Sequence, residues 1–158
     1  MTQEDKELLL KDLSARLPYG VICRITNRDS NYKLVEIDYT YADSSLSFLS
    51  CILPYSGYQT SVVDVELNAV KPYLRSMSSM TEEEWKELNC IGYIVPLYNG
   101  CFGVDMRAYC KNGQPHYRRF SEFSAIEDWL NAHHFDYRGL IEKGLAIAVT
   151  EENNPYKE

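Results

Sequence analysis

The densest group of chemically capable residues is the run from His133 to Gly139, which reads His-His-Phe-Asp-Tyr-Arg-Gly. Two imidazoles, a carboxylate and a guanidinium lie beside a predicted helix N-terminus, a position that attracts anions. Histidine and aspartate are also metal ligands and general acid–base groups. The run therefore offers a metal or phosphate site, or the catalytic group of a small hydrolase or nuclease. That enzyme would use His133, His134 and Asp136.

A structural interpretation of the same run competes with the catalytic one. Adjacent residues on a helix point about 100° apart, so His133 and His134 are poorly placed to bind one ion. Asp136 is expected to cap a short helix through Lys143 by accepting a backbone N–H from Arg138 or Gly139, and Gly144 to end that helix in a left-handed conformation. We favour this interpretation and predict no catalytic residue, no metal and no cofactor. The residues predicted to contribute to binding are His133, His134, Tyr137 and Arg138.

The rest of the chain contains no motif of an enzyme family. The three histidines do not form H-E-x-x-H, and no G-x-S-x-G, phosphate-binding P-loop or G-x-G-x-x-G is present. Cysteines occur singly and without the close pairs typical of zinc sites, at positions Cys23, Cys51, Cys90, Cys101 and Cys110. We expect them to be reduced thiols.

The charge pattern disfavours nucleic acid as a partner. The net charge is −7, with −2 in residues 1–80 and −5 in residues 81–158. Phosphate recognition needs several lysines or arginines on one surface, and the densest basic spot is Arg118-Arg119. No apolar run approaches the length of a membrane span, and the acidic N-terminus does not resemble a signal peptide. The sequence predicts a cytoplasmic protein without a membrane partner.

Tyrosine is unusually frequent, with 13 residues among 158. Its ring supplies contact area at low entropic cost while its hydroxyl stays hydrogen-bonded, so a tyrosine-rich surface favours protein binding. Tyrosines are equally suited to form the half-buried wall of a small barrel, and both interpretations stay open. Together with the missing catalytic motifs, this composition favours a non-enzymatic protein-binding or adaptor module whose partner is another protein. The oligomeric state is not predicted.

Hydrophobic periodicity in the first half predicts one helix and several short strands. Leu9, Leu13 and Leu17 follow helical spacing after Thr2, a suitable N-cap. Alternating residues predict strands near 21–26, 35–41, 46–53 and 60–67, with Val35 and Ile37 on one face. An exit strand is expected at 70–74, where Pro72 should block further pairing. Short antiparallel strands in series suggest a barrel of SH3-like size, covered by the helix.

The second half has clear helix signals around an ambiguous middle. Thr81 and Glu84 form a predicted capping box, and Ser124 and Glu127 a second one whose helix stops near His134. Residues 91–120 read as an extended segment with a hairpin at Asn112-Gly113. The predicted fold is α+β: an N-terminal helix and small antiparallel β-barrel, then a mainly helical C-terminal half with an inserted extended hairpin. The predicted boundaries are 1–78, 79–150 and a polar tail at 151–158.

Three segments carry a family resemblance: Leu10–Val21, Val70–Glu84 and Asp128–Ala146. Together they resemble a group of small proteins of unassigned function in gut Bacteroidales genomes, many of them in prophage-like or mobile regions. The resemblance implies a bacterial cytoplasmic setting. It implies no activity, cofactor or site residue.

Overall fold

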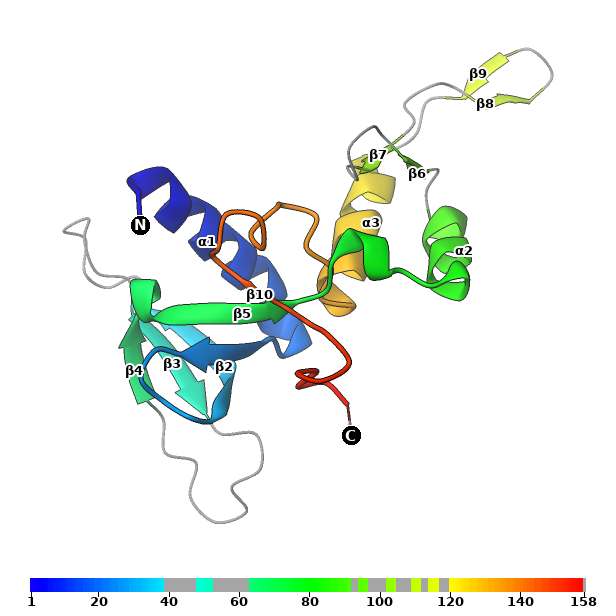
Figure 1. Cartoon of the computed structure of the whole chain (residues 1–158). Helices are drawn as coiled ribbons and strands as arrows, with labels where there is room; N and C mark the ends of the chain where they lie inside the picture. The colour runs from blue at the N-terminus through cyan, green and yellow to red at the C-terminus, as the bar shows by residue number, and fades with distance from the viewer. Residues whose placement is uncertain are drawn as a thin grey trace.

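The computed structural model (Figure 1) begins with helix α1 (Gln3–Arg16), which is fixed at its start by a complete capping box. The Thr2 hydroxyl accepts the N–H of Asp5 at 3.1 Å, and the Asp5 carboxylate accepts the N–H of Thr2 at 3.2 Å. The predicted N-cap is confirmed. The structure describes residues 1–38, 48–52, 63–91, 94–96, 102–104, 109–111, 114–116 and 120–157.

A six-stranded open sheet lies against α1, in the order β10-β5-β1-β2-β3-β4. Its strands are β1 (Ile22–Ile25), β2 (Asn31–Asp38), β3 (Phe48–Ile52), β4 (Val63–Glu66), β5 (Val70–Leu74) and β10 (Ile147–Ala148). Neighbouring strands are antiparallel except β10 and β5, which are parallel. The α+β class is confirmed, and the sheet is mixed.

The predicted closed barrel is wrong. Closure would require the strand after β4 to return and pair with it, but β5 pairs with β1 on one side and with β10 on the other. Pro72 does not block this second pairing, because the β10 partners are Tyr73 and Leu74, one and two residues beyond the proline. Strand β10, near the C-terminus, therefore forms one edge of the sheet.

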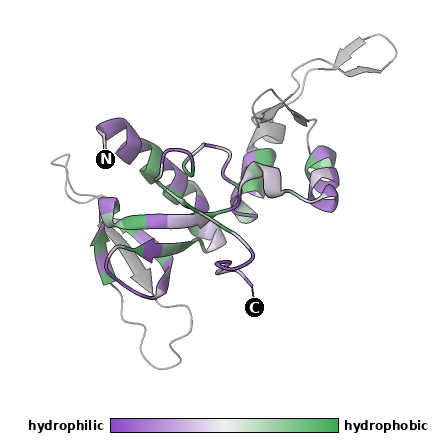
Figure 2. Cartoon of the chain, viewed as in Figure 1, coloured by the Kyte–Doolittle hydropathy of each residue, from purple (hydrophilic) through white to green (hydrophobic). Residues whose placement is uncertain are grey.

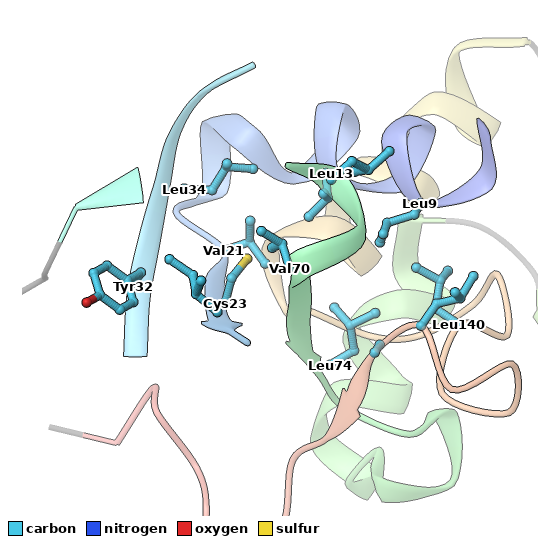
Figure 3. Close-up of a cluster of buried hydrophobic side chains, with 13 residues drawn as sticks. Leu9, Leu13, Val21, Cys23, Tyr32, Leu34, Val70, Leu74 and Leu140 are labelled. Atoms are coloured by element: carbon cyan, nitrogen blue, oxygen red, sulfur yellow. The ribbon is translucent and has the colours of Figure 1, made fainter. Parts of the chain in front are cut away.

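The main core fills the space between α1 and the sheet. Figure 3 shows Leu9 and Leu13 of α1 beside Val21, Val70 and Leu74, with Leu140 completing the cluster. All of these side chains are buried. One strand position differs from the prediction: a register shift between Leu34 and Glu36 leaves Val35 exposed, while Leu34 is buried.

Two helices and two short strand pairs make up most of the remainder. Their bounds are α2 (Glu82–Ile91), α3 (Phe120–Ala132), β6 (Ile94–Pro96), β7 (Phe102–Val104), β8 (Tyr109–Lys111) and β9 (Gln114–His116), and single 3-10 turns are η1 (Leu17–Tyr19), η2 (Leu67–Ala69) and η3 (Met77–Ser79). The Thr81–Glu84 capping box is confirmed. β8 pairs antiparallel with β9 on either side of the predicted Asn112-Gly113 turn, which itself lies outside the described residues. Helix α3 begins at Phe120, so the start predicted at Ser124 is wrong.

The C-terminal half is not mainly helical, contrary to the prediction. Residues 136–146 form bends and turns in place of the expected helix. Gly139 has φ +74°, a left-handed conformation that interrupts a right-handed helix. A second hydrophobic cluster joins α2 and α3 around Leu88, Ile126, Leu130 and Phe135, with Trp85 and Trp129 packed against it.

Candidate functional site

The corner after α3, residues 133–144, holds the residues that the sequence selected for chemistry. His134 is the left-handed residue that ends α3, with φ +58°. The N–H of Phe135 donates to the Leu130 carbonyl at 2.9 Å and the N–H of His134 to the Asn131 carbonyl at 3.1 Å, the two bonds of a Schellman motif. Glycine usually occupies this position, and a residue with a Cβ destabilises it by about 1–2 kcal/mol.

The two adjacent histidines point to different surroundings. The Nδ1 of His133 lies 2.8 Å from the Trp129 carbonyl, where it must donate, and its ring stacks on Trp129 at 3.9 Å. The His134 ring is buried against the Tyr156 ring, with centroids 4.0 Å apart and planes 11° apart. Desolvation in this position lowers the pKa of His134 to about 4, with the charges of Arg16 and Arg75 adding to the effect. The structure does not bring the two imidazoles together.

Asp136 uses both carboxylate oxygens to hold the backbone of the next turn. Its Oδ1 accepts the N–H of Leu140 at 2.9 Å, and its Oδ2 accepts the N–H of Ile141 at 2.7 Å. The expected partner was the N–H of Arg138 or Gly139, and the observed partners lie two residues further along the chain. The left-handed conformation of Gly139 turns the chain so that the N–H groups of Leu140 and Ile141 point at the Asp136 carboxylate. Gly144 has φ +69° at the end of this turn.

We expect Asp136→Ala to lower the free energy of unfolding by about 2 kcal/mol, the upper range for loss of a capping carboxylate. Asp136→Asn should recover only about half of this, because an amide has a single acceptor oxygen and its NH₂ faces the second N–H. Urea unfolding of both variants measures the difference. Equal stability of both variants and the parent would exclude the capping role.

Arg138 joins a buried ionic cluster that the sequence did not reveal as a site. Asp12 and Arg16 of α1 both have 0% exposure. The Asp12 carboxylate accepts Nε of Arg16 at 2.7 Å and Nη1 of Arg138 at 2.9 Å, and Nη2 of Arg16 donates to the Phe135 carbonyl at 2.7 Å. Asp12 and Arg16 continue the spacing of Leu9 and Leu13 (i, i+3, i+4, i+7), and that placement on the apolar stripe was the available signal.

Tyr137 is held between the ionic cluster and α3. Its hydroxyl donates to Oδ1 of Asn131 at 3.2 Å, and the Arg138 guanidinium lies 4.4 Å from its ring centroid. Burial raises the pKa of Tyr137. Its half-buried ring is therefore part of the packing of the corner.

Arg75 connects the corner to the sheet and to α2. Its N–H donates to the His134 carbonyl and its carbonyl accepts the N–H of Asp136, both at 2.8 Å. Its guanidinium lies 4.2 Å from the Phe135 ring centroid and makes two bonds to the Glu84 carboxylate, at 2.5 and 2.9 Å. The Arg75 side chain is the main partner that lowers the pKa of Glu84.

Most of the polar side chains in this corner bond to other groups of the same chain, so few of their reactive atoms face a possible substrate. His133, Asp136 and Arg138 each have an internal partner, and His134 is buried in a conformation that its backbone enforces. Among the described residues, no three histidine, cysteine, aspartate or glutamate side chains gather as a metal site. The enzyme alternative required His133, His134 and Asp136 to converge, and they do not.

No family model, curated protein or solved structure matches the chain. Within the ranges that the structure describes, no helix has the length and apolar character needed to cross a membrane.

Proposed function

We propose that the chain is a non-enzymatic protein-binding module of bacterial or phage origin that acts in the cytoplasm. The observation that carries the proposal is the internal use of three chemically capable side chains of the 133–144 corner: His133, Asp136 and Arg138. A catalytic group must keep its reactive atoms available to a substrate, whereas these atoms stabilise turns and a buried ionic cluster. The resemblance of three segments to small proteins of prophage-like regions supports the bacterial setting.

The charge on α2 and α3 supports a partner with a basic surface. By sequence, α2 holds four carboxylates and one lysine, and α3 holds three carboxylates and no basic residue, so the two helices carry a net charge of −6. The exposed members are Glu82, Glu83, Glu87, Glu127 and Asp128. We infer that the partner presents a basic surface, because complementary charge directs association and excludes other partners.

Half-buried aromatic rings accompany these carboxylates. Trp85 of α2 and Trp129 of α3 are packed against the second hydrophobic cluster but keep part of their surface accessible. Tryptophan is among the residues most enriched at positions that contribute strongly to protein–protein affinity. Carboxylates around partly exposed tryptophans have the chemistry of an interface, with an aromatic centre and a polar rim.

Charge reversal on this surface tests the proposal. The tagged chain should recover one saturable partner from a Bacteroidales cytoplasmic extract. The triple variant Glu83→Lys/Glu87→Lys/Glu127→Lys should weaken that interaction at least about tenfold, which corresponds to about 1.4 kcal/mol. Affinity of the purified pair, measured at two salt concentrations, gives the result.

A matched control separates this surface from net charge. The triple variant Glu4→Lys/Glu36→Lys/Glu142→Lys changes the same number of exposed carboxylates away from α2 and α3. It should keep the parent affinity within about threefold, because exposed charges act weakly beyond a Debye length of about 8 Å. Equal loss in both triples, or the absence of any saturable partner, would refute the proposal.

A further inference from the structure

The segment after β10, residues 150–157, crosses back over the ends of two central strands, and we call it the strap. Its sequence predicts a polar tail, and Figure 2 shows it in hydrophilic colours. The strap nevertheless docks through one side chain. The Tyr156 hydroxyl accepts the N–H of Ile22 in β1 at 3.2 Å and donates to the Tyr73 carbonyl in β5 at 2.8 Å.

The groups that contact the Tyr156 side chain have the hydrogen-bonding and stacking properties needed to bind a phenol. One backbone donor and one backbone acceptor face the same oxygen, and a hydroxyl is the group that can accept and donate at once. The His134 ring lies parallel to the phenol ring, 4.0 Å from it, and supplies a flat aromatic surface. We call these three groups, on Ile22, Tyr73 and His134, the Tyr156 seat. An ammonium or a carboxylate would satisfy only half of it.

The closed strap leaves polar atoms at the seat without partners. Among the described residues, Nδ1 of His134 and Nη1 of Arg16 are buried and make no hydrogen bond. Their side chains are at least nine-tenths buried. Burial is the main cause of the shifted pKa values of His134 and Tyr156, and the charge of Arg16 acts on both rings. Opening the strap would uncover the His134 ring, which is stacked on Tyr156, and let its Nδ1 bond to water, and this opposes closure.

Few contacts hold the strap in place. Upstream, β10 pairs with β5 at two positions, followed by a bond from the N–H of Val149 to the Leu74 carbonyl. Within the strap, the Asn153 side chain bridges Thr150 and Ala148, and Oδ1 of Asn154 accepts the N–H of Tyr156. The Asn153 bond to the Ala148 carbonyl ties the base of the strap to β10, and among the described residues the Tyr156 hydroxyl makes the hydrogen bonds that reach β1 and β5.

We propose that the Tyr156 seat is a binding site for a p-hydroxyphenyl group, occupied by the chain's own tyrosine until the strap lifts and another tyrosine side chain replaces it. The ligand class follows from the paired donor and acceptor and from the stacking surface. The seat uses no side chain of the acidic helices α2 and α3, so this proposal and the proposed function can fail separately.

The test is to empty the seat and refill it with the side-chain analogue p-cresol. In the full-length Tyr156→Ala variant, saturating p-cresol should raise the melting temperature by about 3 °C and shift the amide resonance of Ile22. Toluene, which lacks the hydroxyl, should give less than about a third of that rise. The parent should respond to neither compound, because its seat is filled.

A second variant keeps the test decisive if Tyr156→Ala does not fold. Asn153→Ala/Asn154→Ala retains Tyr156 but removes the side-chain bonds that shape the strap. Here p-cresol should shift the Ile22 amide at higher concentrations, because it competes with Tyr156. No shift in either folded variant, or equal responses to p-cresol and toluene, would overturn the proposal.

The source of the phenol is resolved with a peptide of the strap sequence Asn-Pro-Tyr-Lys, blocked at both ends. Tighter binding of this peptide than of p-cresol to Tyr156→Ala would support a tyrosine presented by a polypeptide. Binding of p-cresol alone would support the p-hydroxyphenyl site but assign it to a free phenol.

Discussion

Asp12→Ala is expected to lower the free energy of unfolding by about 3 to 5 kcal/mol, the range for removing one partner of a buried ion pair. Asp12 is the only carboxylate bonded to Arg16 among the described residues, and both side chains have 0% exposure. Without Asp12, the Arg16 guanidinium remains charged and buried, with the Phe135 carbonyl as its remaining hydrogen-bond partner among the described residues. Urea unfolding at pH 7 measures the loss.

Two further variants test whether the unpaired, buried charge of Arg16 causes the loss of stability in Asp12→Ala. Glu82→Ala breaks an ion pair with Lys86 whose side chains are mostly exposed, and it should change stability by less than about 0.5 kcal/mol. Asp12→Leu/Arg16→Met removes both charges, and it should be more stable than Asp12→Ala because no uncompensated guanidinium remains in α1. A loss below about 1 kcal/mol for Asp12→Ala would show that the pair is hydrated in solution.

Stability should also fall as the pH is lowered from about 6.5 to about 4, because of His134. Its pKa in the folded chain is about 4, below the ordinary 6.5, so the unfolded chain binds the proton first. The contribution of neutral His134 is complete above pH 6.5 and is lost progressively down to pH 4. The difference between the two pKa values corresponds to about 3 kcal/mol.

His134→Gly isolates this effect. Glycine adopts the left-handed conformation at φ +58° without strain, so the Schellman motif should survive although the ring stacked on Tyr156 is lost. Between pH 6.5 and 4.5, above most carboxyl titrations, the variant should lose much less stability than the parent. The same pH slope in both proteins would show that another group titrates.

Local signals in the sequence predicted the parts of the fold that depend on neighbouring residues. The capping boxes of Thr2 with Asp5 and of Thr81 with Glu84 involve residues three apart, so their side chains reach each other in any helix that begins there. The Thr81 box was recognised from its motif, and Thr2 from its residue type alone. The Ser124 motif failed because α3 begins four residues earlier, and an internal serine then has no free N–H to cap.

The barrel prediction failed because strand partners are chosen over long sequence distances. Nothing near Val70–Leu74 indicates that Ile147 will pair with Tyr73 in parallel. The bulge at Val35 also made a prediction wrong. Simple alternation placed Val35 on the same face as Ile37, but the register shift leaves Val35 exposed. Periodicity describes a regular strand, and one extra residue reverses the faces on either side of it.

In the 133–144 corner, the sequence indicated which residues have structural roles, but it did not predict which groups they contact. Asp136 was selected because aspartate binds backbone N–H groups, but its partners depend on where the chain turns. His134 was expected near a helix end, yet only the backbone shows that it takes the left-handed position. The sequence analysis did not predict that Asp12 and Arg16 are buried, because charged residues of an amphipathic helix usually lie on its solvated face.

Titration of the His134 ring in the folded parent, followed by NMR, tests the structural interpretation of the corner most directly. We expect the imidazole to stay neutral down to about pH 4, and its protonation to coincide with a change in the Tyr156 ring resonances. A midpoint at or above 6.5 would contradict it. That result would mean that His134 is accessible or paired with a carboxylate, as a catalytic histidine would be.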